Sequence, residues 1–140
     1  MRSIRFFPAF ALLLTIIACN AQTTEQNSVG SPVGNVEAYY FHFNARCTTC
    51  KTVEAQAKGD IEMLYPELVK SGKVSFRSVN LDEAEGKTMG DKLGVNGQTL
   101  LLVKGGQKIN ITNEGFMYAV SQPDKLKAVI KEKVDGLLKM

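Results

Sequence analysis

The sequence predicts an α/β fold in which a mixed central sheet carries helices on both faces. Three observations support this prediction: apolar runs of strand length alternate with helix-like segments, paired glycines separate two such runs, and the C-terminal segment has helical periodicity. The expected order is strand, helix, strand, helix, strand, strand, helix. A strand–helix–strand crossover followed by a hairpin and a returning helix produces a sheet with parallel and antiparallel pairs.

The first strand and the helical region after it are predicted as follows. Residues 36–43 (VEAYYFHF) have too few polar side chains for a one-sided strand, so a central strand buried on both faces is expected. A helix follows over about residues 50–57. Gly59 and Asp60 should interrupt it, with Asp60 as the N-cap of a second helical piece over residues 61–70.

The second strand, the next helix and the hairpin come next in the chain. Residues 74–81 (VSFRSVNL) alternate apolar and polar side chains and predict a strand, and residues 82–93 predict a helix. The continuous apolar run at 99–103 (TLLLV) predicts a third strand. The Gly-Gly pair at 105–106 favours a tight turn into a fourth strand over residues 107–112.

A last amphipathic helix is predicted to begin near Gln122 or Pro123 and to run towards Leu138. Apolar side chains recur in it at three- and four-residue steps, which places them on one face. They are Leu126, Val129, Ile130, Val134 and Leu137. With 140 residues, no internal repeat and no second hydrophobic core pattern, the chain is expected to form one domain and to be a monomer.

Composition and charge exclude some classes of partner. Hydrophobic residues make up 44% and charged residues 22% of the chain, which is typical of a globular protein. The formal charge is +3, but Arg2 and Arg5 lie in a segment that we expect to be removed, which leaves 15 basic and 14 acidic residues. A nearly neutral chain lacks the clustered basic surface that nucleic-acid binding requires, so no nucleic-acid partner is expected.

The N-terminus has the pattern of a targeting signal. A short basic head precedes the apolar residues 6–18, a run too short to span a bilayer as a helix. Residues 16–19 (IIAC) resemble a bacterial lipobox, with Ile16 where leucine is usual. The resemblance implies a signal peptide over 1–18, acylation of Cys19, and a lipid-anchored protein of the cell envelope that faces the periplasm. The alternative is an ordinary secretory cleavage site that happens to lie beside Cys19.

A polar linker is predicted between the anchor and the domain. Residues 20–34 (NAQTTEQNSVGSPVG) lack hydrophobic periodicity and cannot bury enough apolar surface to offset the entropy of ordering. We therefore predict that residues 19–35 comprise the lipidated cysteine and a flexible tether. The folded domain is then expected to cover residues 36–140.

The motif Cys47-Thr48-Thr49-Cys50 lies between the first strand and the first helix. Cys47 at a helix N-terminus would have its thiolate stabilised by unpaired backbone N–H groups and by the helix dipole. The thiolate is the form that attacks a disulfide. Cys50, one turn further on, is placed to attack the mixed disulfide and release product. Arg46 adds positive charge beside the motif. This spacing favours redox exchange.

Three other uses of the cysteine pair remain open. A structural zinc site needs four nitrogen or sulfur ligands, but the pair is accompanied by one histidine, His42, so we predict no metal within one chain. A copper- or heme-delivery accessory protein is another alternative, since soft thiolates suit Cu(I), yet no Met-rich or His-rich cluster lies near the motif. A static disulfide would close only a four-residue loop and would stabilise the fold little.

Residues 36–140 resemble the thioredoxin-like superfamily. The resemblance is carried by the CxxC motif at 47–50, by residues 79–82 (VNLD), and by residues 93–95 and 98–106 before and through the predicted hairpin. It implies a thioredoxin-like fold, an oxidoreductase without a cofactor, and protein thiols or disulfides as partners together with a separate redox partner. Cys47 is then the nucleophile and Cys50 the resolving cysteine. The implied substrate groove contains Arg46, Thr48, Thr49, Gln98 and Thr99.

The chain departs from thioredoxin at several positions. Gln98 stands where the family has a cis-proline, and a cis bond without proline costs about 2.5–4 kcal/mol, so a trans bond is expected. The family's buried acid corresponds to Phe41 and its partner lysine to Ser78. His42 and Glu54 are the candidates for the missing proton relay. The substitutions also keep open a non-catalytic binding module with a static disulfide.

Overall fold

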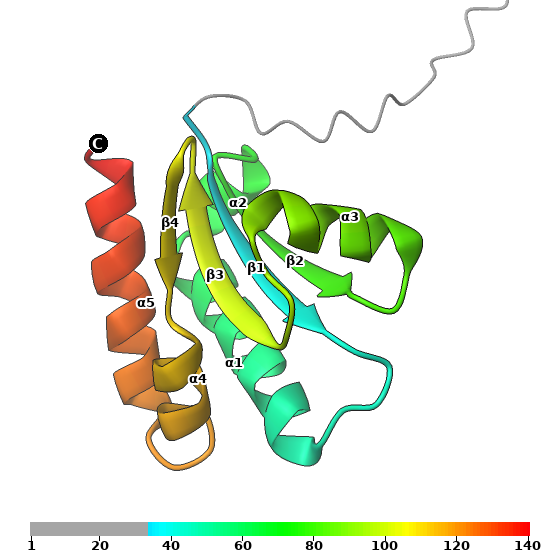
Figure 1. Ribbon diagram of the computed structural model, residues 1–140. Coiled ribbons are helices and arrows are strands. Elements are labelled where there is room, and N and C mark those ends of the chain that lie inside the picture. The colour runs from blue at the N-terminus through cyan, green and yellow to red at the C-terminus, as the bar shows by residue number, and fades with distance from the viewer. Residues whose placement is uncertain (1–33) are drawn as a thin grey trace, which may run out of the picture.

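The computed structural model describes residues 34–140, so the predicted signal peptide, Cys19 and most of the predicted tether lie outside the described residues. Strands and helices are interspersed along the chain (Figure 1). In chain order they are β1 (Val36–His42), α1 (Thr48–Leu64), α2 (Pro66–Lys70), β2 (Val74–Asn80), α3 (Ala84–Leu93), β3 (Thr99–Lys104), β4 (Gln107–Asn110), α4 (Thr112–Tyr118) and α5 (Pro123–Leu138).

The four strands form one mixed sheet in the order β2-β1-β3-β4. Strand β1 is parallel to β2, with Val36 opposite Val74, and antiparallel to β3, with Phe41 opposite Thr99. Strands β3 and β4 form the predicted hairpin, whose turn contains Gly105 at a φ of 57°, a conformation that glycine adopts without strain. The predicted α/β fold with a mixed central sheet is confirmed.

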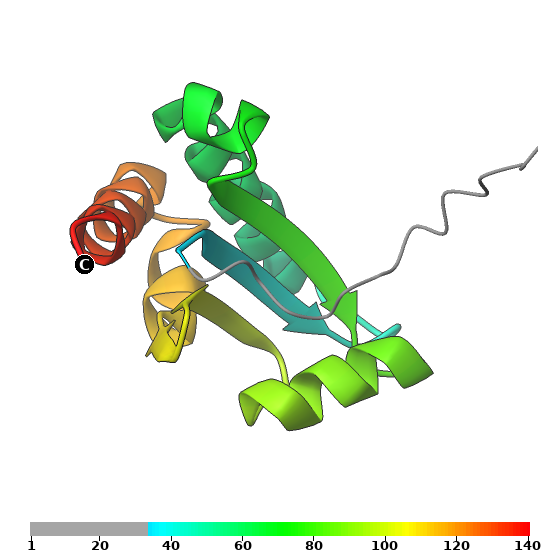
Figure 2. The same cartoon turned by 90° about the horizontal axis from the view of Figure 1, so that it is seen from above.

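The helices cover the sheet unequally. Helices α1, α2 and α5 lie on one face and α3 lies on the other (Figure 2). Alternation along β1 divides its large side chains between these faces: Tyr40 packs in the cluster that contains Val53 of α1, and Phe41 packs in the cluster that contains Met89 of α3. Strand β1 is therefore buried on both faces, as its apolar sequence predicts.

Helix α1 differs from the prediction at its centre. It runs without interruption through Gly59 and Asp60 and ends at Leu64, so the expected break and the N-cap role of Asp60 are wrong. Asp60 is 1% exposed and accepts a 3.0 Å hydrogen bond from the Gln56 amide. These tertiary and helical contacts outweigh the weak helix propensity of the Gly-Asp pair. The break falls instead before Pro66, since the residue preceding proline disfavours helical geometry.

Helix α4 is absent from the predicted order of elements. The sequence predicts a strand through residue 112, but β4 ends at Asn110, whose side-chain oxygen accepts hydrogen bonds from both the backbone N–H and the hydroxyl of Thr112. This local turn releases the chain from the sheet. Gly115 then packs so closely that a Cβ there would lie 3.1 Å from Val53 and 3.4 Å from Leu100. Helix α4 therefore rests against the N-terminal half of α1.

The remaining helices agree with the sequence. Helix α3 ends at Leu93, and the next residue, Gly94, has a φ of 74°. Helix α5 begins at Pro123 and buries the predicted apolar stripe. Within the part of the chain that the structure describes, no helix combines the length and the apolar character needed to cross a membrane.

Candidate functional site

The loop that leads from β1 to the CxxC motif is tied to the end of β2. The backbone N–H of Asn44 donates a 2.7 Å hydrogen bond to Asp82, and the Asn80 amide donates a 2.8 Å bond to the side-chain oxygen of Asn44. The backbone N–H of Leu81 donates to the carbonyl of His42 at 2.7 Å. These bonds fix the direction in which the chain enters α1.

Cys47 is the N-cap of α1, as the motif's position predicts. Its sulfur accepts a hydrogen bond from the backbone N–H of Cys50 at 3.2 Å, and the carbonyl of Cys47 accepts from Lys51 at 3.2 Å. The free N–H groups and the dipole at this helix end favour a negative charge on the Cys47 sulfur. Thr48, the first residue of α1, is exposed, and Thr49 is half-buried.

The two cysteines are joined by a disulfide, with their Cα atoms 5.2 Å apart. Cys47 is exposed, whereas Cys50 is only 4% exposed. An incoming sulfur can therefore reach Cys47 and is kept from Cys50. This unequal access is what sequential exchange requires, because one cysteine must form the mixed disulfide and the other must resolve it. The CxxC pair thus has the geometry of a redox-capable site.

Gln98 lies directly against the buried sulfur. Its side-chain oxygen is 3.1 Å from the Cys50 sulfur, and the residue is half-buried just before β3. Among residues 34–140 no peptide bond is cis, so the bond before Gln98 is trans. Thr99 begins β3, and its hydroxyl donates a 3.0 Å hydrogen bond to the carbonyl of Gly97. Of the predicted groove residues, the structure places Gln98 in contact with the cysteine pair.

Arg46 and Glu54 form an ion pair behind the motif. Their side chains are 21% and 20% exposed, so the pair is largely shielded from water. Glu54 lies one helical turn beyond Cys50, and Arg46 immediately precedes Cys47. The guanidinium of Arg46 is thereby held beside the helix by a carboxylate. The pair brings a negative and a positive group to the same end of α1 as the cysteines.

Tyr40 is a buried β1 residue, within electrostatic reach of Glu54 and Arg46, that was not predicted from the sequence. The comparison with thioredoxin places the family's acid at Phe41, but Phe41 faces α3, and Tyr40 is the β1 side chain in the α1 cluster. Its hydroxyl is buried and has no hydrogen-bond partner among the described residues. Burial raises the pKa of this phenol, Glu54 raises it further, and Arg46 opposes the shift. Neighbouring side chains of a strand face opposite sides of the sheet, so Tyr40 and Phe41 cannot both face α1. This alternation is the signal in the sequence that could have pointed to Tyr40.

His42 makes its contacts between β1 and β2. Its Nδ1 donates to the carbonyl of Phe43 at 3.0 Å, because a carbonyl can only accept, and its Nε2 therefore accepts from the Ser78 hydroxyl at 2.9 Å. Ser78 itself is exposed and pairs with Tyr40 across the strands. Both ring nitrogens of His42 are thus engaged in contacts other than with the cysteine pair.

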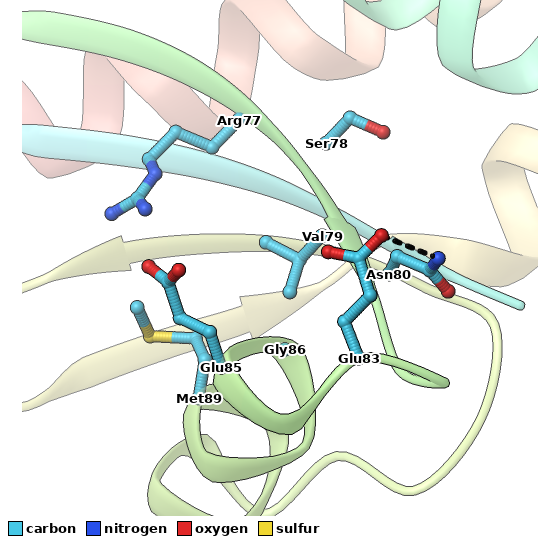
Figure 3. A pocket seen from close by; sticks show the side chains of 8 residues that line it. All are labelled: Arg77, Ser78, Val79, Asn80, Glu83, Glu85, Gly86 and Met89. Carbon is cyan, nitrogen blue, oxygen red and sulfur yellow. Dashed lines mark hydrogen bonds between the residues drawn. The ribbon is translucent and has the colours of Figure 1, made fainter.

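A cavity of about 210 Å³ lies elsewhere, between β2 and α3 (Figure 3). Its lining contains neither cysteine and consists of Arg77, Ser78, Val79, Asn80, Glu83, Glu85, Gly86 and Met89. Asn80 donates a 3.0 Å hydrogen bond to Glu83 at its rim. Among residues 34–140, no group of three or more histidine, cysteine or acidic side chains is arranged to hold a metal ion.

No protein-family model and no curated protein matches the chain. Among solved structures, the chain is similar to one described as the structure of a malarial protein, with 22% identity, a TM-score of 0.45, and coverage of 70% of this chain and 96% of that one. It is also similar to Fasciola hepatica thioredoxin, with 20% identity, a TM-score of 0.43, and coverage of 71% and 81%.

Proposed function

We propose that this protein is a thiol–disulfide oxidoreductase of the cell envelope in which Cys47 is the nucleophile and Cys50 the resolving cysteine. In the reducing direction, the Cys47 thiolate attacks a substrate disulfide, forms a mixed disulfide and releases one substrate thiolate. Cys50 then loses its proton and attacks the Cys47 sulfur, which releases the second substrate thiol. Two electrons pass to the substrate, and the Cys47–Cys50 disulfide remains; the reverse sequence oxidises a substrate dithiol.

The unequal exposure of the two cysteines is the observation that supports this proposal most. Cys47 is exposed at the N-cap of α1, where the helix end stabilises a thiolate, while Cys50 is 4% exposed behind it. A purely structural disulfide does not require that one of its sulfur atoms be accessible at the start of a helix. The short disulfide loop also contributes little to the stability of the fold.

Glu54 is the better of the two candidates for the proton transfer that accompanies resolution. It lies four residues beyond Cys50 on the same helix, and its contact with Arg46 holds the carboxylate at the same end of α1 as the cysteines. His42 has both ring nitrogens engaged by Phe43 and Ser78. We therefore assign the relay to Glu54 within this proposal.

The envelope location rests on the N-terminal sequence. Residues 16–19 (IIAC) resemble a lipobox, and an acylated Cys19 would hold the domain at the membrane through the polar segment that follows. Cys19→Ala should then move the protein from the membrane to the soluble fraction, whereas Cys47→Ser should leave it bound. Membrane retention of Cys19→Ala would remove lipidation as the anchor.

The partners proposed are envelope proteins that carry exposed thiols or disulfides, together with a dithiol or disulfide protein that resets the Cys47–Cys50 pair. The protein is proposed to act as a monomer. Arg46 precedes Cys47, Thr48 and Thr49 follow it, and Thr99 follows Gln98, which contacts Cys50. We propose that substrate backbone reaching Cys47 passes these residues.

The reduction potential of the full chain, measured by equilibration with glutathione buffers, tests the proposal. A value within roughly −270 to −120 mV, the range of known redox carriers, would support an exchange catalyst. Cys47→Ser should abolish exchange, and Cys50→Ser should accumulate mixed disulfides. A potential far below about −300 mV, or no reversible exchange, would rule the proposal out.

A binding module with a static disulfide is the second candidate. The trans peptide bond before Gln98 and the absence of an acid at Phe41 favour it, since both features differ from the catalytic family pattern. Alkylation distinguishes the two functions. After reduction, a catalytic Cys47 should react rapidly with iodoacetamide at neutral pH, and a static pair should react slowly.

A further inference from the structure

We propose that Gln98 sets the redox balance of the cysteine pair by hydrogen-bonding the Cys50 thiol in the reduced protein. This inference rests on the proposed exchange function and assigns to Gln98 a role in the chemistry of the pair. It makes the chain more oxidising than the same fold would be without this side chain. The contact that supports it joins the side-chain oxygen of Gln98 to the Cys50 sulfur at 3.1 Å.

The contact is built into the fold. Gln98 immediately precedes β3, whose residue Thr99 is opposite Phe41 in the register with β1, and Cys50 lies in the first turn of α1. Both side chains are withdrawn from water, Cys50 to 4% exposure and Gln98 to an intermediate value. The two groups are therefore held together by the sheet and the helix, and water competes weakly for either of them.

The hydrogen bond exists in only one redox state. In the disulfide, the Cys50 sulfur carries no proton and has nothing to donate to the Gln98 oxygen. Two-electron reduction by a partner dithiol breaks the Cys47–Cys50 bond and converts the partner to a disulfide. The partner's two thiol protons pass to the released cysteines, so Cys50 becomes a thiol. The S–H group can then donate to the amide oxygen that already faces it. The side chain thereby stabilises the dithiol relative to the disulfide.

Stabilising the dithiol relative to the disulfide makes the protein a better oxidant. The same hydrogen bond keeps the proton on Cys50 while Cys47 reacts, so Cys47 makes the first attack on the substrate. It also slows the attack of Cys50 on the mixed disulfide, which therefore persists longer. A proline in place of Gln98 would have no side-chain acceptor to offer.

The test compares equilibrium constants for oxidation by glutathione disulfide in the full-length protein and two variants. Gln98→Met has similar length but no amide oxygen, and Gln98→Glu keeps an acceptor at the same distance. We expect the constant for disulfide formation to rise about three- to tenfold in Gln98→Met, equivalent to roughly 15–30 mV towards more negative potential. Gln98→Glu should shift the constant the other way, because an ionised acceptor makes a stronger bond.

The controls separate this effect from a general loss of structure. Gln107→Met is a matched substitution at an exposed position of β4, and its constant should equal that of the wild type. Thermal unfolding of both redox forms should show that Gln98→Met destabilises the dithiol form more than the disulfide form. In the infrared difference spectrum of reduced wild type minus reduced Gln98→Met, the S–H band should lie at lower frequency in the wild type.

The outcomes distinguish the two proposals. If the wild type equilibrates reversibly but Gln98→Met has the same constant, or shifts towards more positive potential, the role of Gln98 is overturned and the exchange function stands. If the wild type does not equilibrate at all, both fail. If Gln98→Met does not fold, the equilibrium constant of Gln98→Glu tests the role of Gln98. A Gln98→Glu constant equal to that of the wild type then overturns the inference.

Discussion

The two ends of helix α1 treat their carboxylates differently. Near the cysteines, Glu54 is 20% exposed and pairs with Arg46. Two turns further on, Asp60 is 1% exposed, accepts a hydrogen bond from Gln56, and has Lys127 of α5 only at 4.0 Å. Burial raises the pKa of Asp60, and the smaller effects of Gln56 and Lys127 oppose that shift. Glu54 is paired with a cation near the cysteines, whereas Asp60 is buried and one of its oxygens has no hydrogen-bond partner among residues 34–140.

The two ends of α1 have different roles in the fold. The far end of α1 is packed against α5, where Ile61 is 1% exposed and the hydroxyl of Tyr65 donates a 2.7 Å hydrogen bond to Asp135. This end anchors the helix to the core. The near end leaves Cys47 exposed and keeps charged groups beside it. We therefore expect substitutions at the far end to change stability, and substitutions at the near end to change exchange.

The largest expected effect is at Ile61. Ile61→Ala should lower the free energy of unfolding by about 2–5 kcal/mol, because it removes a fully buried side chain and leaves a cavity between α1 and the core. Urea denaturation measures the change. Met63→Ala, on the same helix at 66% exposure, is the control and should change the value by less than about 0.5 kcal/mol. Equal losses in the two variants would contradict the assignment of this end to the core.

The second effect concerns the hydroxyl that joins α1 to α5. Tyr65→Phe should lower the free energy of unfolding by about 1 kcal/mol, because the hydrogen bond to Asp135 is lost while the ring remains packed. Tyr118→Phe is the matched control on the half-buried α4 face and should have little effect. A Tyr65→Phe variant as stable as the wild type would show that the hydroxyl contributes nothing to docking α5.

This hydrogen bond also has a pH dependence. Lys131 and then Tyr65 lower the pKa of Asp135 through their hydrogen bonds. A lowered folded-state pKa means that the stabilisation is present above the unfolded pKa and is lost as pH falls through the folded value. The difference between wild type and Tyr65→Phe should therefore shrink in acid, below the ordinary range of an aspartate.

Elements with strong local signals were predictable from the sequence. The apolar runs, the Gly105 turn and the periodic stripe of α5 act over a few residues, so they specify strands, the hairpin and the last helix directly. The signal that places Cys47 at a helix start also lies in neighbouring residues, because the motif comes shortly after a strand. The fold class and the position of the cysteine pair follow from such signals.

Features that depend on distant residues were not predictable. Helix α1 continues through Asp60 because that side chain is buried near α5, which lies more than sixty residues away in the chain. The contact of Gln98 with Cys50 spans 48 positions and has no periodic signature. Tyr40 was missed because the resemblance to thioredoxin placed the family's acid at its neighbour Phe41. Alternation along the strand decides which of the two side chains faces α1.

The third effect tests the buried carboxylate through its titration. The pKa of Asp60 is raised in the folded protein, so its contribution to stability is fully present below the unfolded pKa and is lost as pH rises through the folded pKa. Asp60→Asn cannot ionise. At pH 7 it should be more stable than the wild type by about 1 kcal/mol, and the gain should vanish near pH 3.

Urea denaturation between pH 3 and pH 7 measures this gain. Asp124→Asn is the control, since Asp124 also lies 4.0 Å from Lys127 but its side chain is fully exposed. Its stability profile should follow that of the wild type. A pH profile of Asp60→Asn that runs parallel to the wild type would show that Asp60 is as well solvated or paired in the folded chain as in the unfolded one.

The smallest expected effect is at Tyr40. The same tyrosine-to-phenylalanine substitution as at Tyr65 should here change the free energy of unfolding in the opposite direction. Tyr40 is fully buried at the near end, and its hydroxyl has no hydrogen-bond partner among the described residues. Tyr40→Phe removes a polar group that loses its water on folding without compensation, so the free energy of unfolding should rise by about 0.5 kcal/mol. Measured beside Tyr65→Phe under the same conditions, a loss of similar size in both variants would mean that the Tyr40 hydroxyl is satisfied by Glu54 or Arg46. A higher free energy of unfolding in Tyr40→Phe together with a lower one in Tyr65→Phe would show that the buried hydroxyl near the cysteines reduces the stability of the fold.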